Sequence, residues 1–185
     1  MDTLTAIHRR RTVHSWTDTP VDDAVLDRIL DAAHQAPCHR KTWPWRFIVV
    51  GRETREQLVP VGARLAAKKA GVAVSPKVER AVRCKVVNPG ALVAVVLEGS
   101  DDPFRHRENY AATACAIQNM LLAATALGLG SKWGTGGLTR APETASILGV
   151  DTTTEEVVGF VFVGTPAKVP DVGRPPLEDF VSRLA

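Results

Sequence analysis

Apolar residues recur at helical spacing in two segments near the start of the chain. We expect Asp2 to cap a short helix that runs toward Arg10, because apolar side chains follow Asp2 on one helical face. After Pro20 a helical pattern of apolar positions continues to Ala33, and Pro37 ends it. The first part of the chain is therefore predicted to form two helices.

Three apolar runs are predicted to be strands, and residues 131–134 are a fourth, shorter candidate. Residues 47–50 form a short run that ends at Gly51. Every residue from 91 to 97 is apolar, which is typical of a strand buried on both faces. Residues 157–163 form the third run. These runs predict a small sheet at the centre of the molecule.

The segments between these runs predict further helices. Residues 52–70 have a helical pattern that is interrupted or restarted at Pro60. Residues 109–127 predict a long helix that is apolar on nearly every side, and shorter helices are expected at 142–148 and 177–184. Long helices alternating with a few strands indicate an α+β fold. A helix apolar all round must be covered by other elements or by a second subunit.

Length and composition are those of an ordinary globular domain. The chain has 185 residues, of which 45% are hydrophobic and 23% charged, and it shows no repeat or linker. We therefore expect a single domain over residues 1–185. The net charge of +3 is too small to indicate nucleic-acid binding by itself.

Cysteine usage and hydropathy predict a soluble cytoplasmic protein. The three cysteines are odd in number and lack C-x-x-C spacing, which favours reduced thiols over a disulfide scaffold or structural zinc. The N-terminus has no apolar run long enough for a signal peptide. Residues 111–130 approach the length of a membrane span but contain Gln118 and Asn119, so a buried helix is the better interpretation.

A basic cluster stands where the first predicted helix gives way to a loop. Arg9, Arg10 and Arg11 are followed by Thr12, and guanidinium groups with a hydroxyl suit the bidentate recognition of a phosphate. The alternative is a cationic helix end that complements the helix dipole. The residues alone leave both interpretations open.

The segment 37–45 combines aromatic residues with a histidine. His39, Trp43 and Trp45 in an irregular segment are able to form a wall against a planar ring, although tryptophans also simply fill cores. Cys38 adjoins His39, but no orienting acid is evident and the ligands for a metal ion are too few. We expect neither thiol catalysis nor a metal site.

A glycine-rich run follows the long apolar helix. Residues 128–137 match neither the dinucleotide fingerprint G-x-G-x-x-G nor the phosphate-loop pattern. The run does offer backbone that a ligand can approach without obstruction by side chains. A helix cap followed by a tight turn explains it equally well.

Residues 64–85 contain seven basic residues and one acid, Glu79. A solvated helix face is the first explanation, and attraction of an anionic nucleotide is the second. Nucleic-acid binding is the least favoured, because no aromatic residues interleave with the charges to stack on bases.

In chain order, these features resemble the nitroreductase family of flavin enzymes, most closely its compact single-domain members. The resemblance extends over most of the chain. Its motifs are Arg10-Arg11-Thr12, Ala36-Pro37-x-His39 with Pro44-Trp45, the helix running into Gly128-Leu129-Gly130, Trp133-Gly134-Thr135-Gly136, Gly164-Thr165-Pro166 and Arg174-Pro175.

The resemblance implies a nitroreductase-like α+β fold with a mostly antiparallel sheet flanked by helices. It implies a homodimer that binds FMN in a crevice between the subunits, and hydride transfer from NAD(P)H to a nitroaromatic, quinone or similar small acceptor. Because the flavin carries such chemistry, no catalytic side chain is expected. The alternative is a flavin-binding protein of the same fold with specialised chemistry or without reductase turnover.

The resemblance also assigns the FMN contacts. The ribityl and phosphate groups would be held by Arg10, Arg11, Thr12 and Arg174. The flavin would be approached from the other subunit by His39 and Trp43. The isoalloxazine ring would lie along Trp133, Gly134, Thr135 and Gly136.

Two positions depart from the family pattern. His14 stands where the family has a further Arg, and Trp43 stands where compact members often place Gln. A bulkier ring at position 43 predicts a narrower substrate pocket.

Overall fold

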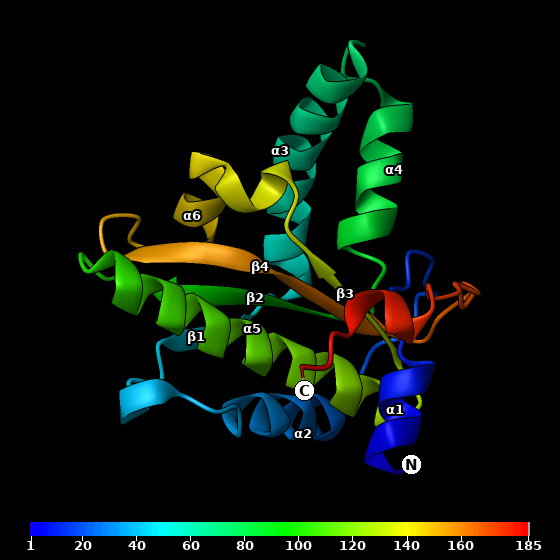
Figure 1. Cartoon of the computed structure of the whole chain (residues 1–185). Helices are drawn as coiled ribbons and strands as arrows, with labels where there is room; N and C mark the ends of the chain where they lie inside the picture. Colours follow the sequence, from blue (N-terminus) through cyan, green and yellow to red (C-terminus); the bar gives the residue numbers. More distant parts are fainter. Residues whose placement is uncertain (185) are drawn as a thin grey trace.

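A four-stranded sheet forms the centre of the computed structural model, which describes residues 1–184 (Figure 1). All neighbouring strands are antiparallel. The strands are β1 (Trp45–Val49), β2 (Ala91–Glu98), β3 (Gly130–Gly134) and β4 (Glu155–Gly164), in the order β1-β2-β4-β3 across the sheet. The predicted α+β fold and antiparallel sheet are confirmed, as are the four predicted strands.

Helices cover both faces of this sheet (Figure 1). The helices are α1 (Thr3–Arg9), α2 (Asp23–His34), α3 (Arg52–Ala70), α4 (Pro76–Val86), α5 (Pro103–Ala126) and α6 (Pro142–Leu148), with short 3-10 turns η1 (His39–Lys41), η2 (Gly137–Arg140) and η3 (Leu177–Phe180). Helices α2 and α5 pack on one face, and α3, α4 and α6 pack on the other. Helix α1 contacts α5.

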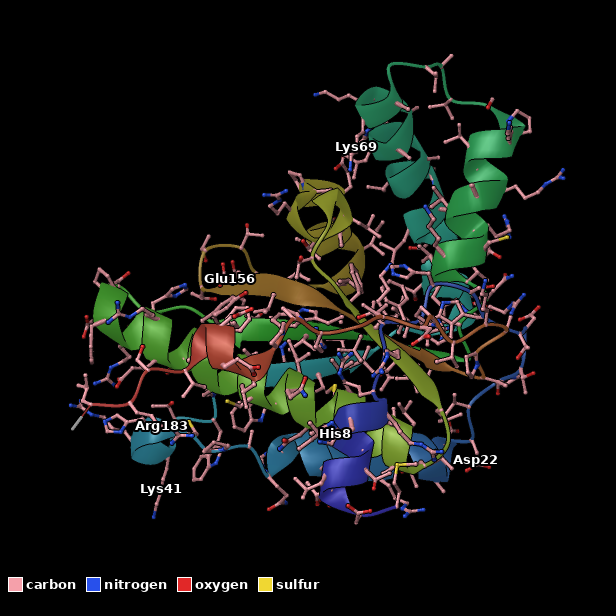
Figure 2. The ribbon with its side chains drawn as sticks, turned by 45° about the vertical axis from the view of Figure 1, so that its right-hand side comes forward. His8, Asp22, Lys41, Lys69, Glu156 and Arg183 are labelled. Atoms are coloured by element: carbon pink, nitrogen blue, oxygen red, sulfur yellow. The ribbon has the colours of Figure 1, made fainter. Side chains whose placement is uncertain are left out.

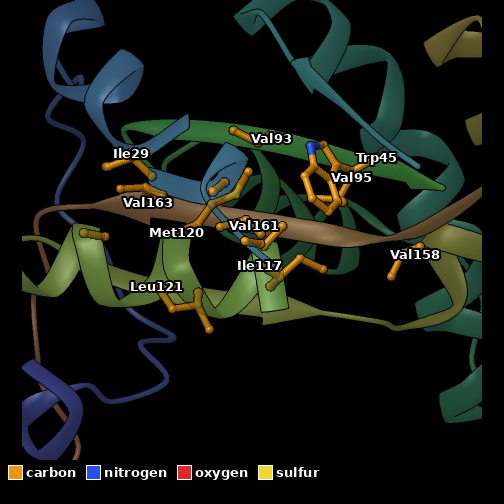
Figure 3. Close-up of a cluster of buried hydrophobic side chains, with 14 of the residues drawn as sticks. Ile29, Trp45, Val93, Val95, Ile117, Met120, Leu121, Val158, Val161 and Val163 are labelled. Carbon is orange, nitrogen blue, oxygen red and sulfur yellow. The ribbon is translucent and has the colours of Figure 1, made fainter. Parts of the chain in front are cut away.

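Strand β2 contributes to two separate hydrophobic clusters because its side chains alternate between the two faces of the sheet. Val93 and Val95 pack with α2 and α5, in the cluster that Figure 3 shows around Ile117 and Met120. Leu92, Ala94 and Val96 pack with α3, α4 and α6. Residues 91–97 are all buried, as their unbroken apolar run predicts.

Most predicted helices are confirmed. Asp2 caps α1 by accepting a hydrogen bond from the backbone N–H of Thr5 at 3.0 Å. Helix α3 continues through Pro60, so the interruption expected there does not occur. Helix α5 starts at Pro103 rather than at residue 109, because Asp102 caps it and its first turns are polar.

The prediction of a terminal helix over residues 177–184 is wrong. Only Leu177–Phe180 form a 3-10 turn, and every residue from 171 to 184 is exposed. An isolated segment this short does not stay helical without a surface on which to bury its apolar face. No other described part of the chain provides that surface.

Helix α5 is covered on one side only. Ala116, Ile117 and Met120 are buried against the sheet, whereas Cys115 and Gln118 on the outer side are exposed. Within residues 1–184, no helix combines the length and hydropathy needed to span a membrane.

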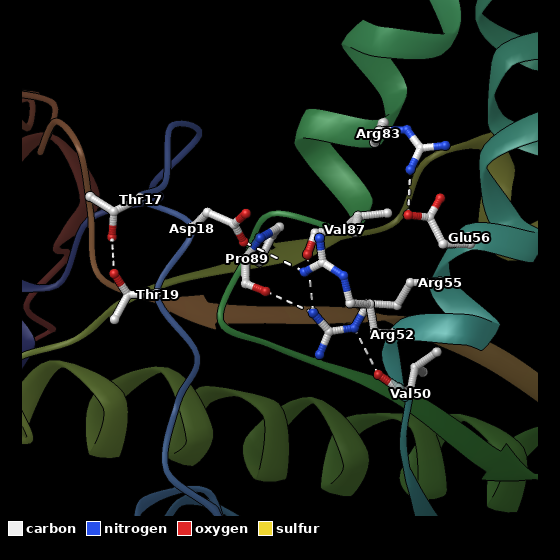
Figure 4. Close-up of polar contacts among 10 residues, drawn as sticks. All are labelled: Thr17, Asp18, Thr19, Val50, Arg52, Arg55, Glu56, Arg83, Val87 and Pro89. Atoms are coloured by element: carbon white, nitrogen blue, oxygen red, sulfur yellow. Dashed lines mark hydrogen bonds and ion pairs between the residues drawn. The ribbon is translucent and has the colours of Figure 1, made fainter.

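Arg55 of α3 is a buried arginine that ties the ends of two strands together (Figure 4). Its guanidinium group donates hydrogen bonds to the carbonyl oxygens of Val50 and Pro89, both at 2.7 Å, and more weakly to that of Val87 at 3.4 Å. Burial, with a smaller effect from the positive charge of Arg52, lowers the pKa of Arg55. One side chain thus joins α3 to the chain that leaves β1 and the chain that enters β2.

We predict that Arg55→Met lowers the free energy of unfolding by about 3 kcal/mol, because it leaves buried carbonyl oxygens without a donor. Urea denaturation measures this loss. Arg52→Met is the matched control. Arg52 is exposed, and its Nη1 lies 3.6 Å from Oδ1 of Asp18, so its loss should change the free energy of unfolding by less than about 1 kcal/mol. Equal losses in the two variants would contradict the role of Arg55.

Candidate functional site

The arginine segment lies beside the open edge of the sheet. Arg10 ends α1, where its backbone N–H donates to the carbonyl of Ala6 at 2.9 Å. Thr12 then forms an isolated parallel bridge with Ser131 of β3, and the N–H of Val13 donates to the carbonyl of Ser131 at 3.0 Å. The structure thus joins two segments that sequence analysis selected separately.

Three guanidinium groups act on one another at this edge. Burial lowers the pKa of Arg10, and the positive charges of Arg174 and then Arg11 lower it further. The Arg11 side chain donates to the carbonyl of His8 at 2.6 Å and to that of Arg10 at 3.0 Å. Among residues 1–184, none of the three arginines is in an ion pair. Positive charge without acidic partners is what an anion-binding site requires.

Beyond Thr12 and Ser131, β3 continues into the glycine-rich loop. Strand β3 pairs with β4 on one side, and on its other side the described chain supplies only the bridge to Thr12. A Cβ atom added to Gly136 would meet no heavy atom within 4 Å, and Thr135 and Gly136 are exposed. The backbone of this loop is open to a ligand.

Trp133 directs its indole inward rather than toward the loop. The ring packs with the hydrophobic cluster of α2 and α5 and lies over Gly159 of β4, where an added Cβ would be 2.2 Å from Nε1. The buried Nε1 has no hydrogen-bond partner among the described residues. Its side chain is therefore part of the core, and only the backbone at position 133 is available for a ligand at the edge of the sheet.

His39 and Trp43 lie elsewhere, beside the N-terminal half of α5. Thr42 donates from Oγ1 to Oδ1 of Asn109 at 3.2 Å, which holds this segment against α5. Trp43 is 52% exposed. The backbone N–H of Trp43 donates to Sγ of Cys38 at 3.2 Å.

The backbone of this segment is strained. Arg40, Lys41 and Trp43 have φ values of 59°, 55° and 42°, in the left-handed region that L residues disfavour by about 1–2 kcal/mol each. Strain of this kind is concentrated at functional sites. Residues 39–43 thus combine a strained backbone with an exposed indole.

Within one chain, the predicted site residues form two groups. Arg10, Thr12 and Arg174 belong to the end of the molecule where α1 packs on the last turns of α5, whereas His39 and Trp43 adjoin its earlier turns. Figure 2 shows this separation through His8 on α1 and Lys41 in η1. From Asn109, which holds Thr42, to Ala126 beside α1, helix α5 rises about 26 Å, so the two groups of one chain lie at different ends of this helix.

Two lysines from segments that sequence analysis considered separately, residues 64–85 and the glycine-rich run 128–137, share a cavity with the glycine loop. Lys132 of β3 and Lys85 of α4 line a cavity of about 580 Å³ together with Gly134, Gly136 and Gly137. Burial lowers the pKa of Lys132, and the positive charge of Lys85 lowers it further. The sequence signal for this pair was the position of Lys132, a charged residue within a short strand between apolar and glycine residues.

Comparisons with known proteins identify the family of the chain and relatives of its fold. The model of the nitroreductase family matches residues 7–165. YfhC of Bacillus subtilis, provisionally named an NAD(P)H nitroreductase, is 31% identical over 175 residues, which cover 94% of this chain and 89% of YfhC.

Two solved structures share the whole fold. A nitroreductase-like family protein from Bacillus cereus superposes with a TM-score of 0.84 at 25% identity, over 100% of this chain and 96% of that one. A provisionally named nitroreductase from Desulfovibrio desulfuricans, solved in complex with FMN, has a TM-score of 0.77 at 25% identity, over 100% and 98% of the two chains.

We predict that Arg10→Gln raises the melting temperature by about 1–2 °C in low-salt buffer without phosphate, because it relieves repulsion among three like charges. Added inorganic phosphate should stabilise the wild-type protein more than the variant. Differential scanning fluorimetry measures both effects. The control is Arg28→Gln on the exposed face of α2. An equal response of the two variants to phosphate would show that the arginine cluster is not an anion site.

Proposed function

Because this chain belongs to the nitroreductase family, we propose that it is an FMN-dependent oxidoreductase that uses NADH or NADPH to reduce a nitroaromatic, quinone or similar small acceptor. The observation that carries the proposal is the set of three arginines beside the open edge of β3, which have no acidic partner among residues 1–184. FMN needs an anion site for its phosphate and an unobstructed surface for its ring. The three arginines support the first requirement, and the open backbone after β3 supports the second.

We assign the phosphate of FMN to Arg10, Arg11 and Arg174, and the ribityl chain to Thr12. A guanidinium group makes paired hydrogen bonds to phosphate oxygens, and its charge strengthens them. The orphaned charges of the cluster are then matched by the ligand. Binding also draws together the two ends of the chain, since Arg174 lies far from Arg10 in sequence.

We assign the isoalloxazine ring to the backbone from Trp133 to Gly136. The indole of Trp133 packs over Gly159 of β4, and the glycines keep the approach to the loop free of side chains. FMN held by these residues would supply the hydride-transfer chemistry between the nicotinamide donor and the acceptor. The residues of the chain bind and orient the reactants, and none is assigned as a nucleophile or acid–base catalyst.

We further propose that the chain acts as a single-domain homodimer in which His39 and Trp43 of one subunit approach the FMN site of the other. The separation of the two residue groups along α5 supports this arrangement. The exposed C-terminal segment supports it as well, because large apolar side chains without cover indicate a partner surface. These side chains are Val172, Leu177, Phe180, Val181 and Leu184.

The three cysteines are free thiols, and Cys84 and Cys115 are exposed. Exposed free thiols persist in a reducing compartment, so we propose that the protein works in the cytoplasm.

We predict that purified protein shows the visible absorbance of bound FMN and that Arg174→Ala weakens FMN far more than riboflavin, which lacks the phosphate. One desolvated charge-assisted contact corresponds to about 10- to 150-fold in affinity. Fluorescence titration of both flavins measures this. Arg28→Ala, on the exposed face of α2, is the control and should affect neither flavin. Equal losses for the two flavins in Arg174→Ala would remove Arg174 from the phosphate site.

The same preparation decides between the reductase and a flavin-binding protein without turnover. The exposed Trp43 favours the second possibility if its ring closes the acceptor site of the partner. A steady-state assay with NADPH and a nitrofuran distinguishes them: sustained NADPH oxidation supports the reductase, and bound FMN without turnover supports the alternative.

We predict that the wild-type protein sediments as a dimer and that Leu177→Asp with Phe180→Asp shifts it toward monomer. Both side chains are more than two-thirds exposed, at 73% and 71%, and would place charges in the proposed interface. Val72→Asp is the matched control, because Val72 is 53% exposed at the turn after α3, outside that interface. A wild-type monomer that binds FMN would refute the two-subunit site.

A further inference from the structure

The cavity that contains Lys132 and Lys85 is apolar in its walls. It lies between the α3–α4 hairpin and the sheet, and its apolar lining comes from Leu65, Val82, Val86, Leu138, Phe160 and Phe162. Gly134 and Gly136 line it too, so it adjoins the loop to which we assign the flavin ring. Flat apolar molecules suit such walls.

The charged groups in this cavity are all positive. Its cationic lining consists of Lys132, Lys85, Lys69 and Arg140, and no acidic residue lines it. Among residues 1–184, none of these four side chains is in an ion pair. Nζ of Lys132 lies 5.4 Å from the ring centroid of Phe162, which is a cation–π contact.

Keeping Lys132 here is unfavourable for the protein without a ligand. A half-buried ammonium group loses hydration, and a second lysine nearby repels it. A hydrophobic side chain of similar length would fill the same space without either cost. An anion bound between the two lysines would offset both, which is a reason to retain the charge.

We infer that this cavity binds a flat, apolar electron acceptor that carries a carboxylate, with Lys132 and Lys85 holding the carboxylate. The inference rests on the proposed function, since it names the acceptor class of that reductase. An aromatic carboxylate fits both features of the cavity, because its ring matches the apolar walls and its charge matches the lysines. A nicotinamide donor would bring a larger, strongly hydrated phosphate that these walls do not suit.

The first test compares 4-nitrobenzoate with its neutral isostere 4-nitrobenzamide. The wild-type holoenzyme should have the lower KM for the carboxylate, and Lys132→Met should raise the ratio of KM for the carboxylate to KM for the amide about tenfold. Lys85→Met should raise the same ratio. Lys77→Met, which removes an exposed lysine of α4 outside the cavity, is the matched control and should leave the ratio unchanged.

The second test needs no turnover. Calorimetry should detect 4-nitrobenzoate binding to the wild-type protein and a loss of affinity in Lys132→Met, while the melting temperature of that variant without ligand should rise. An unchanged KM ratio with intact reduction of the amide would overturn the inference, as would a variant whose KM rises for NADPH instead. If no FMN binds and neither acceptor is reduced, the proposed function fails, and the calorimetric result alone then decides whether the cavity takes the carboxylate.

Discussion

Burial of the central strands on both faces is the constraint on which the rest of the molecule depends. Strand β2 is apolar from Ala91 to Leu97 and pairs with β1 on one side and β4 on the other. Such a strand is stable only where helices cover both faces of the sheet, so α2 and α5 pack below it and α3, α4 and α6 above it in Figure 1. Strand β3 is the edge strand beside the N-terminal arginines, and next to it the α3–α4 face of the sheet retains a cavity.

Unmatched positive charge accumulates around this edge strand. Arg10 and Arg174 lie at the end where Thr12 meets β3, and Lys132 with Lys85 lies on the face toward the α3–α4 hairpin. Each set consists of groups that repel one another. The fold tolerates this because the apolar core supplies stability elsewhere, and the two sets divide the work of the proposed site: one for the phosphate of the cofactor, the other for the charge of a substrate.

The sequence predicted what depends on local pattern and missed what depends on tertiary neighbours. Residues 91–97 were assignable because every position is apolar. The helix expected over 177–184 does not form, because apolar residues at helical spacing stabilise a short helix only where another surface covers them. Lys132 had no periodic signal, since its meaning comes from Lys85, far earlier in the chain. The resemblance implied that Trp133 contacts the ligand, but its indole points inward because residue 159 is a glycine and leaves space for the ring.

The contact between Trp133 and Gly159 couples the residue sizes that these two positions tolerate. A side chain at 159 would occupy the space of the indole, and a small residue at 133 would leave a void beneath β4. Neither residue is therefore free to drift alone, although they belong to different strands. A substitution that changes the size of one of these two residues therefore requires a matching change in the other.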